Sequence, residues 1–124
     1  MTQEEKALIL KDLCARLPYN PMVEYKGETY NVLGIVHGRV VLCKPFMSHT
    51  LVKHPLVEEV KPYLFPLSSM TPKQKAELEH LTADIDGIFE QVLVEIEFYH
   101  RHHIDYRGLI EMGLALDATG LNIY

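Results

Sequence analysis

The sequence lacks the long hydrophobic run that a membrane-spanning helix requires. Its longest apolar stretches, such as residues 7–10 and 40–43, have about four residues, whereas a span needs roughly 18. A basic, hydrophobic leader is also missing, because Glu4 and Glu5 stand near the start and no apolar segment follows them. We therefore expect a cytoplasmic protein with no membrane partner.

Cysteine is scarce, and basic residues are not in excess. Only Cys14 and Cys43 are present, and their spacing does not fit a structural zinc site, so we expect two buried free thiols. Asp and Glu number 17 against 12 Lys and Arg, which gives a net charge of −5. Nucleic-acid binding is therefore not expected, since it needs a basic face to displace counterions from phosphates.

The composition is that of an ordinary globular domain. Apolar residues make up 48% of the 124 residues and charged residues 23%, near the averages for such proteins. A chain of this length forms one domain, here residues 1–124. We divide it into a helix and β-meander over residues 1–70 and a helical part with a tail over residues 71–124.

Residues 1–70 are predicted to form one helix followed by short strands. Thr2 and Glu5 have the spacing of a capping box, apolar residues recur at helical spacing up to residue 17, and Pro18 ends the helix. Alternating β-branched and aromatic residues then predict strands over residues 22–26, 28–36 and 39–44. Gly27 and the pair His37-Gly38 mark the turns between them.

Four prolines interrupt residues 45–70, which makes this segment hard to assign. Residues 57–64 are predicted as an edge strand or one turn of helix, because Pro62 suits the edge of a sheet but not its centre. We expect the segment to close the sheet or to lie across it. The predicted fold is α+β: an N-terminal helix, a small curled antiparallel sheet of three to four strands, with an SH3-like barrel as one form, and a helical C-terminal third packed on it.

Two longer helices are predicted in the last third of the chain. Thr71, Pro72 and Gln74 have the pattern of a helix start. A second helix begins near Ile85, and a last short helix is expected over residues 107–115. One stripe of the second helix collects apolar and aromatic residues at helical spacing. Its members are Ile85, Ile88, Phe89, Val92, Ile96, Tyr99 and His103.

Three stretches of the chain resemble a known family. They are KDLCARLPY (residues 11–19), KPYLFPLSSMT (residues 61–71) and HHIDYRGLIEMGLAL (residues 102–116). Together they resemble an uncharacterised family of short proteins encoded by phages and prophages of anaerobic gut bacteria. The resemblance is weakest at residues 45–56 and 82–95. It implies an intracellular phage accessory protein that acts by binding, and it carries no functional residues.

A histidine cluster offers a metal-site hypothesis. His100, His102 and His103 lie within four residues and Asp105 follows. On a helix His100 and His103 would be neighbours, whereas His102 would point away. A metal-binding protein or metal-dependent hydrolase that uses His100, His103 and Asp105 is therefore one alternative. The competing interpretation places His103 at the edge of the core, and we expect no cofactor.

The most distinctive polar group is Asp105, Tyr106 and Arg107. Arg107 has a planar fork for a carboxylate or phosphate, and Tyr106 is a stacking partner. In the structural alternative, Asp105 caps the last helix, and Arg107 pairs with Asp105 or with a carbonyl of the tail.

We predict a binding surface rather than an active site. No nucleophile motif of the G-x-S-x-G type is present, whereas Tyr63 and Phe65 lie in a segment, residues 61–70, that is rich in proline and aromatic residues. Tyr and Arg are enriched at binding hot spots, so this segment and residues 105–107 are the candidate surface. The predicted function is a non-enzymatic protein-interaction or accessory module that binds a protein partner or itself. A small β-barrel that binds nucleic acid is a further alternative.

Overall fold

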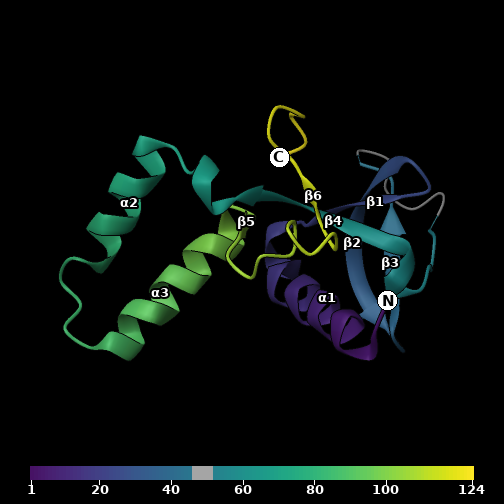
Figure 1. Ribbon diagram of the computed structural model, residues 1–124, viewed down its shortest axis with the longest axis horizontal. Helices are drawn as coiled ribbons and strands as arrows, with labels where there is room; N and C mark the ends of the chain where they lie inside the picture. Colours follow the sequence, from purple (N-terminus) through teal and green to yellow (C-terminus); the bar gives the residue numbers. More distant parts are fainter. Residues whose placement is uncertain (46–51) are drawn as a thin grey trace.

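The computed structural model describes residues 1–45 and 52–124 and confirms the α+β class. A helix and a sheet form the body of the molecule, and a hairpin of two helices projects from one side of it (Figure 1). The helices are α1 (Gln3–Arg16), α2 (Pro72–Thr82) and α3 (Ile88–Arg101). The strands are β1 (Met22–Tyr25), β2 (Glu28–Val36), β3 (Arg39–Cys43), β4 (Val60–Pro66), β5 (Ile104–Asp105) and β6 (Leu116–Asp117), and 3₁₀ turns cover Leu17–Tyr19, Val57–Glu59 and Leu67–Ser69.

The predicted start of α1 is confirmed in detail. The Glu5 amide donates to the Thr2 hydroxyl at 3.0 Å, and the Thr2 amide donates to the Glu5 carboxylate at 2.8 Å. These reciprocal bonds satisfy amides that have no partner within the helix. The buried face of α1 places Ile9 and Leu13 in the hydrophobic core.

The predicted meander of β1, β2 and β3 is also confirmed. Each tight turn uses a pair of residues with positive φ, Lys26-Gly27 after β1 and His37-Gly38 after β2. Such turns match the right-handed twist of the strands that they connect. Both ladders are antiparallel, and the β2–β3 register shifts between Val32 and Gly34.

β4 lies inside the sheet, so the prediction of an edge strand was wrong. The strand order is β3-β2-β1-β4-β5, with β6 also paired to β4. Pro62 pairs with Val23 of β1, whereas β6 and β5 join the other side of β4 only from Tyr63 onward. Pro62 lacks an N–H group and lies where one ladder ends and the other has not begun.

The sheet is curled and mixed rather than purely antiparallel. The segment before β4 forms single bridges to β3, at Arg39–Leu56 and Leu42–Lys53, and the chain then crosses to pair with β1. An SH3-like barrel was one expected form of this sheet. Among the residues that the structure describes, however, the ladder does not close, and β5 and β6 both run parallel to β4.

The core lies between α1, the curled sheet and the C-terminal segment. It contains side chains from each of these parts, which explains why the chain folds around it as one body. The buried members are Ile9, Leu13, Val23, Tyr30, Val32, Val40, Leu42, Val57, Val60, Leu64, Leu109, Leu114 and Ala115.

The predicted last helix over residues 107–115 is absent, and this segment forms turns instead. Gly108 and Gly113 have φ angles of 78° and 76°, which lie outside the right-handed helical region. The Asp105 carboxylate holds the turn by accepting hydrogen bonds from the Leu109 and Ile110 amides, each at 2.9 Å. The expected capping role of Asp105 is therefore correct, but it caps a turn.

Only one of the two cysteines expected to be buried lies in the interior. Both cysteines are free, but only Cys43 is buried, because Cys14 lies on the exposed side of α1.

The helical hairpin of α2 and α3 does not pack along the sheet as expected, since it extends away from the body (Figure 1). No helix in residues 1–45 and 52–124 combines the length and the apolar character needed to cross a membrane.

Candidate functional site

The two segments of the predicted binding surface meet at one groove of about 470 Å³. Pro66, Leu67 and Ser68 line one part of it, and residues 105–108 line another. Tyr63 and Phe65 are not among the lining residues. They contact Tyr124 instead: its hydroxyl donates to the Tyr63 carbonyl at 2.9 Å, and its ring centroid lies 5.9 Å from that of Phe65.

Two of the charged residues beside this groove, Asp105 and Arg107, are already engaged within the fold. Asp105 binds backbone amides, as described above, and the Arg107 Nε donates to the Asp12 carboxylate at 3.0 Å. The expected partner of Arg107, Asp105, is therefore replaced by a residue of α1. Whether Asp105, Tyr106 and Arg107 also bind a partner stays a prediction.

A buried ion pair beneath the groove connects α1 to α3 and β5. Asp12 and Arg16 are both fully buried, and the Arg16 Nε donates to the Asp12 carboxylate at 3.0 Å. The Arg16 Nη atoms donate to the carbonyls of Tyr99 at 3.2 Å and Ile104 at 2.7 Å. All three guanidinium nitrogens are thereby satisfied, which a buried arginine requires.

Asp12 and Arg16 were not among the functional residues predicted from the sequence, so this ion pair was missed. Their i,i+4 spacing was the available signal, but the same spacing is common on solvated helix faces. Only the carbonyls at the end of α3 and in β5, more than 80 positions away along the chain, make burial of Arg16 favourable.

Tyr106 connects this ion pair to His100. Its hydroxyl lies 2.7 Å from the His100 Nε2, and the Arg107 guanidinium lies 4.7 Å from the centroid of its ring. Tyr99 stacks against the same ring at 5.6 Å. Burial lowers the pKa of His100 and raises that of Tyr106, so both side chains are neutral at pH 7.

The proposed metal ligands are not brought together. His103 is buried and stacks on Tyr124 with ring centroids 3.6 Å apart, His100 contacts Tyr106, and Asp105 binds backbone amides. Across residues 1–45 and 52–124, no three His, Cys, Asp or Glu side chains are placed to hold a metal ion. These contacts fit the structural interpretation, with His103 at the edge of the core.

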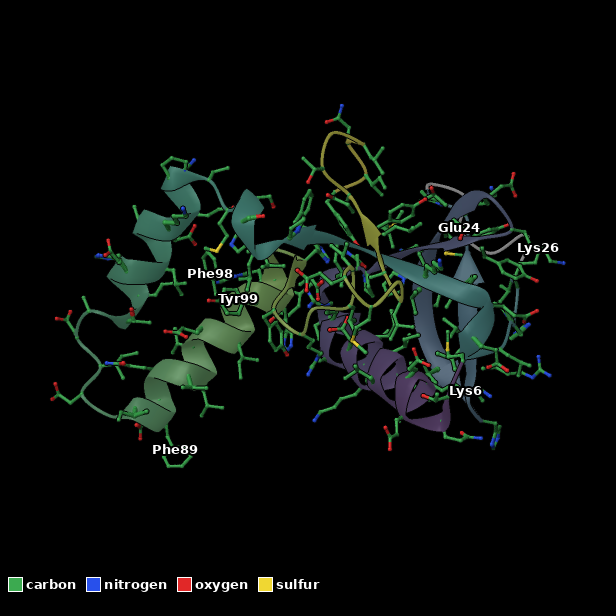
Figure 2. The ribbon with its side chains drawn as sticks, in the orientation of Figure 1. Lys6, Glu24, Lys26, Phe89, Phe98 and Tyr99 are labelled. Atoms are coloured by element: carbon green, nitrogen blue, oxygen red, sulfur yellow. The ribbon has the colours of Figure 1, made fainter. Side chains whose placement is uncertain are left out.

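Several large apolar side chains of α3 are exposed to solvent. Four residues of its first half are involved, which we call the α3 face. They are Ile88, Phe89, Val92 and Leu93, with 79%, 84%, 44% and 65% of their surface exposed. At 100° per residue they span about 140° of the helix, and Phe89 points away from the rest of the molecule (Figure 2).

The α3 face is exposed because α2 covers a different side of α3. Phe98 is the only fully buried residue of α3, and it lies toward α2 and the body (Figure 2). Phe98 and Phe89 are about 180° apart around the helix axis. The apolar stripe predicted from the sequence is present from Ile88 to Tyr99, and the structure leaves its first half uncovered. Its predicted end members lie outside the helix, because Ile85 precedes α3 and His103 follows it with a φ of 56°.

The hairpin is also polarised in charge. Its tip carries the exposed acidic residues Asp84, Asp86 and Glu90. The base next to the body carries exposed Lys73, Lys75 and Arg101, together with exposed Glu97, whose carboxylate accepts a hydrogen bond from the Tyr19 hydroxyl at 3.4 Å. The start of α2 and the end of α3 meet there, since Gln74 and Arg101 line the same cavity.

Comparisons with family models, with curated proteins and with solved structures found no match.

Proposed function

We propose that this chain is a non-enzymatic protein-interaction module whose binding surface is the α3 face. The observation that carries the proposal is the contiguous exposure of Ile88, Phe89, Val92 and Leu93 on a projecting hairpin. Contiguous apolar patches of this kind are uncommon on soluble monomers and usually mark interaction sites.

The chemistry of the α3 face indicates its mode of binding. An apolar stripe of one helix with a phenylalanine at its centre is suited to pack against another helix or into an apolar groove. Large apolar and aromatic side chains supply most of the binding energy in such contacts. Action by binding on an intracellular partner is also what the resemblance to phage accessory proteins implies.

Site-specific photo-cross-linking tests this proposal. A photoreactive phenylalanine analogue is introduced at position 89, on the α3 face, or at position 90, which lies on the charged side of the same helix, in cells that produce the chain. We expect cross-linked species, to any protein including a second copy, from position 89 and not from position 90. Equal yields at the two positions, or none at either, would contradict the proposal.

A further inference from the structure

We infer that a small aromatic carboxylate binds in the cavity where the hairpin joins the body, with its charged group at Arg101. We call this the junction cavity, and its wall includes Phe65, Gln74, Arg101, His102, His103 and Tyr124. It is separate from the α3 face, so its test does not depend on the proposed function.

The junction cavity is formed by parts of the chain that are distant in sequence. Its volume is about 500 Å³, within the range of roughly 300–1,000 Å³ that is usual for small-molecule sites. The hairpin contributes the start of α2 and the end of α3, and the body contributes β4, the turn after α1 and the C-terminal tail. Figure 1 shows the end of α3 at this junction, next to β5. The cavity is therefore large enough for a small organic molecule.

Two adjacent histidines of the cavity wall have unused hydrogen-bonding capacity. The His102 Nε2 and the His103 Nδ1 are buried and have no hydrogen-bond partner. In the part of the chain that the structure describes, only one other buried side-chain atom is in this condition, the Asn31 Oδ1. A buried polar atom without a partner costs free energy. Two such atoms beside one cavity therefore point to a bound molecule that completes their hydrogen bonding.

The backbone at His103 has a conformation that is uncommon for residues other than glycine. Its φ of 56° lies in the left-handed region. The His103 side chain is only 6% exposed, and its ring stacks on that of Tyr124 with centroids 3.6 Å apart. Backbone strain of this kind concentrates at ligand sites, and here it fixes the His103 ring in the wall of the cavity.

The polar groups of the cavity are mainly hydrogen-bond donors. The Gln74 Oε1 accepts from the Thr71 amide at 3.0 Å, which leaves its NH₂ group for a ligand. Arg101 is exposed and forms no ion pair with a carboxylate of residues 1–45 and 52–124. Burial lowers the pKa of His102 and of His103, so each ring is neutral at pH 7 and presents one N–H donor. Donors that converge with a guanidinium favour an anionic oxygen group.

Carboxylates near the cavity limit the charge of the ligand. Glu97 accepts a hydrogen bond from the hydroxyl of the lining residue Tyr19 at 3.4 Å, and the Glu77 carboxylate opposes the fall in the pKa of His102. Arg101 is the one lining residue with a full positive charge at pH 7. A ligand with a single negative charge therefore fits better than a doubly charged phosphate.

The rest of the wall is apolar or aromatic. Met22, Phe65, Ile123 and Tyr124 all line the cavity. The Tyr124 ring is fixed in place, because its hydroxyl accepts from the Met22 amide at 2.8 Å and donates to the Tyr63 carbonyl at 2.9 Å. Aromatic walls suit a planar hydrocarbon group, which together with the donors favours an aromatic carboxylate.

Titration of the purified full chain with benzoate, followed by NMR of the histidine ring carbon–proton signals, tests the inference. We expect the His102 and His103 signals to shift saturably with a dissociation constant below about 10 mM. The signal of His37, in the turn between β2 and β3, should not move, and the neutral analogue benzyl alcohol should bind at least about fivefold more weakly. No saturable shift of the His102 and His103 signals up to roughly 50 mM benzoate, or equal binding of benzyl alcohol, would overturn the inference.

A pair of charge-removing variants tests the role of Arg101. Arg101→Gln and Lys61→Gln each remove one positive charge from an exposed side chain, but only Arg101 lines the cavity. We expect Arg101→Gln to raise the dissociation constant of benzoate at least about fivefold and Lys61→Gln to leave it unchanged. Equal affinities of the two variants would refute the placement of the charged group at Arg101. The comparison of benzoate with benzyl alcohol uses the unaltered chain, so it decides the inference even if Arg101→Gln does not fold.

Discussion

Among single residues, Arg16 carries the most demanding interactions of this fold. Its guanidinium is removed from water and compensated by one carboxylate and two carbonyls from three different parts of the chain. Arg107 binds the second oxygen of the same Asp12 carboxylate. Asp12 therefore connects α1 with the loop that follows β5.

Replacing Asp12 by Asn should destabilise the protein strongly. The substitution leaves Arg16 buried without a counter-charge, and removal of one partner of a buried ion pair typically costs about 3–5 kcal/mol. Urea unfolding followed by circular dichroism measures the change. Lys6→Ala is the control: its ion pair with Glu58, at 3.6 Å, is partly exposed, and we expect a loss below about 1 kcal/mol. Similar losses for both variants would contradict this interpretation of Asp12.

His103 makes stability depend on pH. Burial, together with the nearby Arg16 charge, lowers the pKa of His103 from 6.5 to about 4. The unfolded chain therefore binds a proton between about pH 6.5 and 4 that the folded chain does not. The stabilisation is complete above pH 6.5 and is lost as the pH falls toward 4.

The variant His103→Asn tests this pH dependence. Asparagine does not titrate, and it tolerates the positive φ of 56° at this position. Between pH 7 and pH 4 the free energy of unfolding of the wild type should fall by about 3 kcal/mol more than that of the variant. Urea unfolding at both pH values provides the measurement. Equal falls in the two proteins would show that His103 is not the titrating group.

At the level of elements, the features predicted correctly from the sequence are those that depend on residues a few positions apart. The capping residues Thr2 and Thr71 and the turn at His37-Gly38 are all found as expected, because each depends on hydrogen bonds or dihedral angles within a few residues. The last helix was predicted wrongly, since two glycines with positive φ and the Asp105 carboxylate favour a turn there. Pro62 was misread because its exact position between two ladders is not visible in the sequence.

The period of α3 was predicted correctly, but its environment was not. An apolar stripe looks the same in a sequence whether it faces a core or a partner. Phe98, outside that stripe, is the residue that α3 buries, whereas Phe89 within it is 84% exposed. Periodicity identifies a face, and only the arrangement of neighbouring elements shows whether it is covered.

The two phenylalanines of α3 should therefore behave in opposite ways. Phe98→Ala should lower the free energy of unfolding by about 3–5 kcal/mol, because it empties a buried site. Phe89→Ala should change it by less than about 1 kcal/mol, because the Phe89 side chain is 84% exposed. Chemical denaturation at low protein concentration provides the comparison. A large loss for Phe89→Ala in the monomer would mean that Phe89 packs within its own chain.

On the scale of the whole molecule, a folded body presents a hairpin with an apolar face and opposite charges at its ends. Parts of the two segments predicted as a binding surface, residues 66–68 and 105–107, meet at one groove, but the α3 face was not part of the predicted surface. Both regions depend on contacts between distant parts of the chain. The sequence therefore predicted α1, α2 and α3, but not which face of α3 remains open.

The most direct test of the central claim is a cross-linking scan along α3. The photoreactive residue is placed at each position from 88 to 97 in turn, and the yield of cross-linked species in cells is measured. Binding through the α3 face should give maxima at 88, 89, 92 and 93 and minima at 90 and 97, because these positions follow the helical period of the exposed face. A yield that is flat along the helix, or highest on the charged side, would contradict it.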